Sequence, residues 1–298
     1  MANVLTLKTV KLDQVTPRWW HRLGGIRTAI FYAVMVAISA FSLFPLVWMA
    51  GTSLKTAEEA NRSQLNIIPE DAQWDNYTHL LEDSAFQRAY LNSVFVTTMV
   101  LIGTTVSVSL VAFAFSRLEW KGRNVVFALM LGTLMIPDQM TMVPQYVLFF
   151  KLGWLRSFNP ITLPGFFAGG AALIFLLRQF MMTIPKEIDE AAMMDGANPI
   201  QTWWYIIMPL CRPAIATISI FLFVGNWNSL FRPIVYLKQA ELTTMPIYVS
   251  LLNNNQESPI PWQNIMAASV LFVLPVLVTF ILSQRFFVEG ITLTGSKG

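Results

Sequence analysis

Five separate stretches of this chain are apolar over about the length that a helix needs to cross a lipid bilayer, and none contains a charged residue. They are Thr28–Ala50, Leu91–Phe115, Ile161–Leu177, Ala214–Leu230 and Ile265–Ser283. A helix crosses the hydrocarbon core with roughly 20 apolar residues. Only 12% of the residues are charged, about half the share in a soluble domain. An all-α polytopic membrane protein is therefore the expected fold.

A sixth apolar stretch is interrupted in its middle. It runs from Asn124, meets Pro137 and Asp138, and becomes apolar again through Phe150. Because proline ends or kinks a helix, we expect a span over Asn124–Pro137, followed by a short interfacial helix near Tyr146–Lys151. The chain would then have six transmembrane helices.

The hydrophilic segments between these spans alternate in their content of lysine and arginine. Counted from the N-terminus, the first, third, fifth and seventh segments hold 13 Lys/Arg, and the intervening three hold 7. Lys/Arg-rich segments face the cytoplasm, so both termini are expected there. The acidic segment Thr52–Tyr90 is then expected outside.

The sequence contains no recognisable catalytic, cofactor or metal site. It has no G-x-x-x-x-G-K-[ST] phosphate loop, no H-E-x-x-H and no G-x-S-x-G. Its single cysteine, Cys211, and its two histidines, His21 and His79, do not form a cluster with metal-ligand spacing. The net charge of +3 is too small to indicate nucleic-acid binding. We therefore predict no enzyme activity, no cofactor and no metal in this chain.

The source of energy for any transport must also lie elsewhere. Ion pumps keep ionisable groups inside the bilayer as relays, and Asp138, expected at the outer end of its helix, is the one candidate among the six spans.

A hydrophilic interruption, D-E-A-A-M-M-D-G-A-N-P at residues 189–199, predicts a helix, a turn and a second helix. Pro185 suits a first helical turn, and the acidic residues that follow it favour a helix N-terminus. Gly196 can adopt the left-handed conformation that ends a helix. Asn198 and Pro199 then suit the N-cap and first position of a second helix that runs to about Met208.

One face of the first predicted helix is small and apolar. Ile188, Ala191 and Ala192 share this face at i, i+3 and i+4, so a partner surface could approach closely. The alternative is an amphipathic loop on lipid headgroups, but its acidic residues would be repelled by an anionic leaflet.

This stretch resembles the cytoplasmic loop of the permeases of binding-protein-dependent ABC importers, with the pattern E-A-A-x3-G-x9-I-x-L-P. The matching residues are Glu190-Ala191-Ala192, Gly196 and Ile206-Ile207-Met208-Pro209, with Met208 in place of leucine. Three more stretches resemble the carbohydrate branch, of the maltose and glycerophosphate type. These are Arg178-Gln179-Phe180 before Ile184-Pro185, Gly225-Asn226-Trp227-Asn228, and Gln284–Gly290 with Lys297-Gly298.

The resemblance covers nearly the whole chain and implies a set of partners. They are a second homologous permease in a heterodimer, two cytoplasmic ATPase subunits and an external solute-binding protein. The chain itself would be embedded in the lipid of a bacterial or archaeal plasma (inner) membrane. It also implies that the loop at residues 184–209 docks on an ATPase subunit and that the C-terminal tail reaches between the ATPase subunits. The residues expected to couple transport to ATP hydrolysis are Glu190, Ala191, Ala192, Asp195, Gly196, Ile206 and Pro209.

The fifth predicted span carries an unusually polar run, Asn226-Trp227-Asn228-Ser229. Polar side chains within a bilayer face a cavity or a neighbouring helix. Asn226, Trp227 and Asn228 are therefore candidates for the substrate path, because a tryptophan ring and amides suit a sugar. The alternative is that they hold helices together, with Trp227 at the membrane interface.

The sequence thus predicts a permease subunit of an ATP-driven importer for a sugar, oligosaccharide or polyol derivative. Residues 1–27 form a cytoplasmic tail, 28–284 the six-helix permease domain with its core at 88–284, and 285–298 a cytoplasmic tail. The alternatives are a self-contained secondary carrier or channel, which intramembrane charge would favour, and an ABC permease for amino acids or peptides. A membrane enzyme is a more distant alternative.

Overall fold

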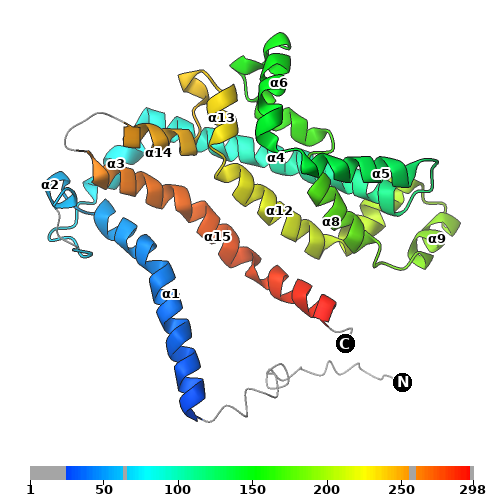
Figure 1. Ribbon diagram of the computed structural model, residues 1–298, viewed down its shortest axis with the longest axis horizontal. Coiled ribbons are helices and arrows are strands. Elements are labelled where there is room, and N and C mark those ends of the chain that lie inside the picture. Colours follow the sequence, from blue (N-terminus) through cyan, green and yellow to red (C-terminus); the bar gives the residue numbers. More distant parts are fainter. Residues whose placement is uncertain (1–24, 63–65, 255–259, 296–298) are drawn as a thin grey trace, which may run out of the picture.

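The structure is a computed structural model that describes residues 25–62, 66–254 and 260–295, and every regular element within these residues is a helix (Figure 1). The expected all-helical fold is confirmed. Within the described residues, four helices, or six where each of two bent pairs is counted as one span, are long and apolar enough to cross a membrane.

Five long helices carry the architecture. They are α1 (Gly25–Ser53), α4 (Ser84–Ser116), α8 (Ala171–Met181), α12 (Arg212–Trp227) and α15 (Trp262–Gly295). Helices α5 (Arg123–Gly132) and α6 (Asp138–Lys151) form a bent pair. Short helices connect these elements: α2 (Ala57–Ala60), α3 (Asp75–Glu82), η3 (Thr133–Met135), η4 (Trp154–Arg156), α7 (Asn159–Thr162), η5 (Leu163–Phe166), α13 (Phe231–Tyr236), η7 (Ala240–Leu242) and α14 (Met245–Asn254).

The loop between α8 and α12 contains helices of its own. They are α9 (Glu187–Met194), α10 (Pro199–Gln201), the π-helix η6 (Thr202–Ile207) and α11 (Met208–Leu210). Figure 1 shows α9 beside the ends of α5 and α8, and α3 and α14 together at the opposite end of the bundle. We call these the α9 end and the α3 end.

Helix α4 lies at the centre and packs against α8, α12, η5 and α14. Its backbone approaches η5 closely at Gly103, where an added Cβ would come within 2.3 Å of the Phe166 ring. Ser107 fixes the same contact by donating a hydrogen bond to the carbonyl of Gly165 at 2.8 Å. Small and hydroxyl residues allow helices to pack closely within a membrane, so the hydroxyl-rich sequence of α4 matches its central place.

The third span differs from the expectation in the length of its second half. After Met135 the chain bends by 101° and α6 begins at Asp138, eight residues before the interfacial helix expected at Tyr146–Lys151. Pro137 is extended (φ −60°, ψ 134°) and breaks the helix, while Asp138 favours the N-terminus of a new one. Pro144 lies inside α6 without ending it.

The fourth and fifth spans are also interrupted. The fourth extends over Asn159–Met181, but positive φ angles at Ala168 (56°) and Gly170 (150°) separate its first part from α8. The fifth, α12, ends at Trp227, three residues before the expected Leu230, and meets the preceding helices 199–210 at an angle of 82°. The polar run that begins at Asn226 therefore lies at the end of the helix, where backbone groups need side-chain or solvent partners.

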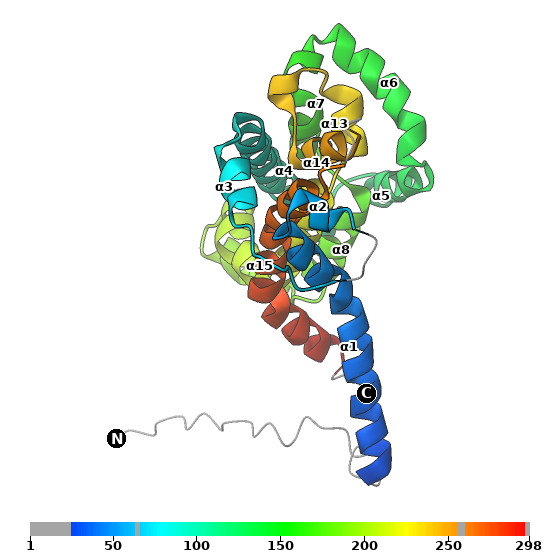
Figure 2. The same cartoon turned by 90° about the vertical axis from the view of Figure 1, so that its left-hand side faces the viewer.

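The first and last helices pack against each other near the α3 end and run away from it (Figures 1 and 2). Within the span Arg27–Ser53 the most apolar window of α1 has no buried residue, so its apolar surface is uncovered in the isolated chain. The backbone of α15 remains helical to Gly295, well beyond the expected end at Ser283. Most of the expected N-terminal tail, residues 1–24, lies outside the described residues, as do 296–298 of the C-terminal tail.

Candidate functional site

Two features could serve transport: the α9–α10 segment at one end of the molecule and a small polar cavity beside α12. The first is shaped by the turn at Gly196, whose φ of 83° is left-handed. The N–H of Gly196 donates to the carbonyl of Met193 at 3.0 Å, and the N–H of Ala197 donates to that of Ala192 at 2.9 Å. This pair of bonds is the Schellman motif, which ends a helix at a glycine.

The second helix of the segment begins with a complete capping box. The backbone N–H of Gln201 donates to Oδ1 of Asn198 at 2.9 Å, and the N–H of Asn198 donates to Oε1 of Gln201 at 2.8 Å. The helix does not stop before Pro209 as expected but continues to Leu210. It does so by widening into the π-helix η6, in which the N–H of Met208 bonds to Trp203. Pro209 then follows without an N–H of its own to satisfy.

The expected small face of the first helix is divided between the interior and the surface. Ala192 is buried against this chain, so it is not available to a partner as expected, whereas Ala191 is exposed and Ile188 is half-buried. The reason is that residues three apart lie on the same face of a helix. Asp189 and Ala192 share the face of α9 that is buried against the rest of the chain. Glu190 and Asp195 are exposed, Ile206 is half-buried and Pro209 is exposed.

The outward side of this segment is apolar to an unusual degree for a hydrophilic loop. Met194 is 88% exposed, and four more large apolar side chains are also exposed: Met193, Ile200, Trp204 and Tyr205. We call these five residues the α9–α10 patch. An exposed apolar patch of this kind is typical of an interaction surface.

Behind α9 lies an ion pair that the sequence did not reveal. Nη1 of Arg117 donates to Oδ2 of Asp189 at 2.8 Å, and their side chains are only 4% and 11% exposed. Burial raises the pKa of the Asp189 carboxyl, and the Arg117 guanidinium counters that effect. In the sequence the two residues are 72 positions apart, so spacing could not pair them.

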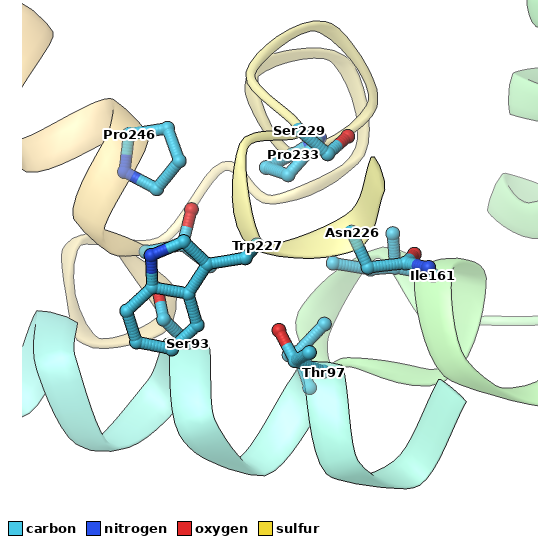
Figure 3. A pocket seen from close by; sticks show the side chains of 10 residues that line it. Ser93, Thr97, Ile161, Asn226, Trp227, Ser229, Pro233 and Pro246 are labelled. Atoms are coloured by element: carbon cyan, nitrogen blue, oxygen red, sulfur yellow. The ribbon is translucent and has the colours of Figure 1, made fainter. Parts of the chain in front are cut away.

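The second feature is a cavity of about 10 Å³ between α4, α7, α12 and α14. Figure 3 shows Ser93 of α4 beneath the ring of Trp227, with Pro246 of α14 above that ring, and Thr97 of α4 on the side of Asn226 of α12. Buried Thr244, whose Oγ1 has no partner among the described residues, also lines it. This volume holds about one water molecule, so a sugar would need the helices to move apart.

The three path candidates have different environments within this region. Trp227 is 2% exposed and lines the cavity, and its ring stacks on those of Phe223 and Phe272, at centroid distances of 5.6 and 5.9 Å. Its Nε1 donates to the carbonyl of Phe272 at 2.9 Å, so the buried ring leaves no room for a sugar in this conformation.

The two asparagines bond within their own helix. Asn226 Nδ2 donates to Leu222 at 2.8 Å and Asn228 Nδ2 to Val224 at 2.9 Å, and of the two only Asn226 lines the cavity. Sequence reasoning missed Ser93, Thr97 and Thr244. The first two lie at i and i+4 on one face of α4, a signal that could have been noticed.

The remaining ionisable groups do not form a catalytic or metal site in the described part of the chain. No group of three or more His, Cys, Asp or Glu residues there could hold a metal ion. Asp138 pairs with Arg232 at 2.9 Å, and both side chains are at least half exposed, so this pair is not a buried proton relay. Cys211 is fully buried in the hydrophobic core.

Known proteins with similar sequences are transport permeases. The chain is 32% identical over 273 residues to the trehalose/maltose transport system permease protein of Thermococcus litoralis, covering 90% of this chain and 96% of that protein. It is 30% identical over 268 residues to the arabinooligosaccharides transport system permease protein of Bacillus subtilis, covering 88% and 92%. It is also 30% identical over 270 residues to the sn-glycerol-3-phosphate transport system permease protein of Yersinia pestis, covering 88% and 95%.

A solved structure has the same fold. A chain of a bacterial ABC transporter involved in the import of the acidic polysaccharide alginate superposes with a TM-score of 0.79, at 24% identity, over 91% of this chain and 99% of that one. Residues 109–292, which include α9, the π-helix and the polar run after α12, match the family described as binding-protein-dependent transport system inner membrane component. The chain therefore belongs to this family of importer permeases, and the alternative of a self-contained carrier or channel is set aside.

Proposed function

We propose that this chain is the transmembrane permease subunit of an ATP-driven importer for a sugar, oligosaccharide or polyol derivative. The observation that carries the proposal is the α9–α10 segment, which presents an exposed apolar patch at one end of a membrane-embedded bundle. The segment lies within the part of the chain that matches the importer family. The substrate class is supported by the names of the relatives, which transport trehalose or maltose, arabinooligosaccharides and glycerol phosphate.

The α9–α10 patch is the surface that would meet an ATPase subunit. Its methionines suit this role because Met is flexible and packs against varied surfaces. Glu190, Ala191 and Asp195 lie on the exposed side of α9 or at its end, where Glu190 could pair with a basic group of the partner. Two ATPase subunits are proposed because each of two permeases would offer one such segment.

A second homologous permease is the partner proposed for the uncovered apolar surface of the chain. The apolar window of α1 is not buried by its own chain, and it diverges from the bundle (Figure 2). Lipid would cover part of this surface. A second permease that packed between α1 and the bundle would bury more of the apolar surface of α1 than the chain buries alone. An external solute-binding protein follows from membership of a binding-protein-dependent family.

The proposed orientation puts the α9 end in the cytoplasm of a bacterial or archaeal cell. The lysine and arginine distribution supports it, since the connections at Arg117–Arg123 and Arg178–Arg212 belong to the set of segments that holds 13 of the 20 Lys/Arg. Helix α1 begins, and α15 ends, away from the α3 end, which is consistent with both termini in the cytoplasm.

The proposed translocation path passes the cavity between α4 and α12. Asn226 lines it with Ser93 and Thr97, and amide and hydroxyl groups can exchange hydrogen bonds with sugar hydroxyls. The ring of Trp227 would become available only if α12 moved away from α15. Asn228, exposed at the end of α12, would contribute nearer the outer opening.

Co-purification followed by ligand screening tests the proposal. We expect the tagged chain to bring down a homologous permease and an ATPase from its native membrane. The solute-binding protein of the same system should bind a sugar, oligosaccharide or polyol derivative in a thermal-shift screen. A chain that purified without an ATPase, or a binding protein that bound amino acids instead, would contradict the proposal.

A further inference from the structure

The α4, α8 and α9 helices are joined at one point by two arginines: Arg117, whose side chain is buried, and Arg178, which is half-buried. Nη2 of Arg117 donates to the carbonyl of Met181, the last residue of α8, at 2.6 Å and to that of Ile184, three residues beyond the helix, at 2.9 Å. In return, Nε of Arg178 on α8 donates to the carbonyl of Phe115 on α4 at 3.2 Å. The last carbonyls of a helix lack intrahelical partners, so these bonds fix the two helix ends to each other.

Helix α9 is attached to these helix ends mainly through Asp189. The helix has eight residues and buries only Asp189 and Ala192, so few apolar contacts hold it. Asp189 accepts the 2.8 Å hydrogen bond from Nη1 of Arg117. Nη2 of the same guanidinium donates to the carbonyl of Met181 in α8. A planar guanidinium keeps its donors in a fixed relative geometry, so the position of Asp189 is tied to the ends of both α4 and α8.

Stability alone is a weak explanation for this arrangement. A buried ion pair is often no more stabilising than apolar residues of similar size, because both charges lose hydration. Arg117 Nε and Asp189 Oδ1 are buried without partners in the described residues, which adds to the cost. What the pair does supply is a fixed geometry between α9 and the two spans.

The fixed geometry extends to the cavity. Helix α4 is continuous from Ser84 to Ser116 and contains no proline. At about 1.5 Å per residue, Arg117 lies roughly 36 Å along the helix axis from Ser93, which lines the cavity. If α4 moves as a rigid body, a displacement of its Arg117 end would therefore also displace Ser93 and Thr97.

We propose that the Arg117–Asp189 pair is the mechanical link through which α9 drives α4 and α8, with both residues acting as positioning residues. The link rests on the proposed docking of α9 on an ATPase subunit. Movement of α9 with that subunit would be transmitted through the pair to the ends of α4 and α8, and along α4 to the cavity. If the pair is broken, α9 should still reach its partner but move independently of the spans.

Distance measurements between spin labels on α8 and α9 test the link. Labels are placed at Met182→Cys and Met194→Cys, both exposed, with the buried Cys211 replaced by alanine. In the full chain alone, in lipid nanodiscs, we expect one narrow distance distribution. Asp189→Asn, which keeps the size of the side chain and removes its charge, should broaden this distribution, and Arg117→Gln should do the same.

A double variant and a control make the result specific. If the two residues act through each other, Arg117→Gln with Asp189→Asn should broaden the distribution no more than the more severe single change, because a shared interaction is lost only once. Lys186→Ala removes the exposed 3.8 Å pair with Glu119 in the same region and should leave the distribution narrow. Unchanged width in both single variants, or additive broadening in the double variant, would overturn the link.

The assembled complex tests transmission. After trapping with ATP and vanadate, the α8–α9 distance should stay constant in the unmodified complex and shift in Asp189→Asn. ATP hydrolysis stimulated by the loaded binding protein should fall roughly tenfold in the variant, a typical size for coupling between sites, while the ATPase still co-purifies. A distance that shifts in the unmodified complex, or full stimulation in the variant, contradicts the link. Failure of any ATPase to co-purify would refute the proposed function instead, and the nanodisc measurement would still decide the link.

Discussion

At the scale of single residues, the environment of a charge decides what its removal costs. Arg117 and Arg232 each pair with an aspartate, at 2.8 and 2.9 Å. The first pair is buried and also holds two carbonyl groups, whereas the second is largely exposed. Losing Arg117 would leave an unpaired carboxylate in a buried place and would remove the side-chain hydrogen bonds to the carbonyls of Met181 and Ile184, of which the first still accepts from the N–H of Ile184.

Arg117→Met should therefore destabilise the protein by about 3–5 kcal/mol, the usual cost of removing one partner of a buried pair. Arg232→Met, the matched control, should cost less than about 1 kcal/mol, as for exposed pairs. Thermal unfolding in detergent compares the two variants with the unmodified chain. Equal losses would show that the burial of the Arg117 pair has no energetic consequence.

At the scale of elements, the end of α12 combines a packing residue with two amides. Trp227 stacks on aromatic rings of α12 and α15, and its Nε1 donates a hydrogen bond to the α15 backbone. Asn226 borders the cavity, and Asn228 is exposed. The three adjacent residues should therefore respond differently to substitution.

Trp227→Ala should weaken the folded protein by about 3–5 kcal/mol, because it removes a large, fully packed side chain. The expected observation is a lower melting temperature and poor recovery of the assembled complex. Phe231→Ala, which removes an exposed aromatic side chain just beyond the same helix, is the control and should have little effect. A Trp227→Ala protein of normal stability would show that the stacking is dispensable.

Asn226→Leu and Asn228→Leu should reduce uptake of the solute found by screening while the complex still assembles. If the amides instead hold helices together, assembly itself should weaken, by about 1 kcal/mol for each lost hydrogen bond. Uptake into proteoliposomes and recovery of the complex are measured on the same preparation. Normal transport in the double leucine variant would exclude both amides from the path.

The strongly periodic and strongly punctuated parts of this fold were predictable from sequence. The long apolar runs predicted the spans, Gly196 predicted the turn after α9, and Asn198 predicted the N-cap of α10. The length of α6 was not predicted, because an apolar stretch after a proline does not say whether a new helix starts at once. The inward direction of Ala192 was missed because an amphipathic pattern does not show which side faces the bundle. The Arg117–Asp189 pair depends on tertiary contacts alone.

At the scale of the whole molecule, the two ends of the bundle differ in chemistry. The α9 end presents the α9–α10 patch and contains the lysine- and arginine-rich connection Arg117–Arg123. The α3 end contains the acidic segment Thr52–Tyr90. Such an asymmetry is expected where one end faces an ATPase and the other a solute-binding protein.

Labelling of intact cells tests this orientation. Cysteines are introduced at Glu58, whose side chain is 83% exposed, and at Met194, 88% exposed; the neighbouring Glu59 is buried and unsuitable. A membrane-impermeant maleimide should modify position 58 and not position 194, because Lys/Arg-rich loops remain in the cytoplasm. After the cells are broken open and the complex is separated, position 194 should also react. If only position 194 were modified in intact cells, the α9 end would face the outside and the proposed orientation would be wrong.

The central claim is that the segment around Gly196 couples this permease to ATP hydrolysis. The left-handed φ of Gly196 would cost a β-branched residue about 1–3 kcal/mol, so Gly196→Val should tilt α9 and disturb its docking. Glu190→Lys should keep the helix and reverse the charge offered to the partner. Gly132→Val is the matched control, because Gly132 has helical backbone angles and no atom within 4 Å of an added Cβ.

The decisive measurement is ATP hydrolysis by the reconstituted complex, with and without the loaded solute-binding protein. We expect strong stimulation in the unmodified complex and in Gly132→Val, and its loss in Gly196→Val and in Glu190→Lys, although all the chains insert normally. Full stimulated hydrolysis and full uptake in both Gly196→Val and Glu190→Lys would show that this segment is only a surface loop, and would contradict the account.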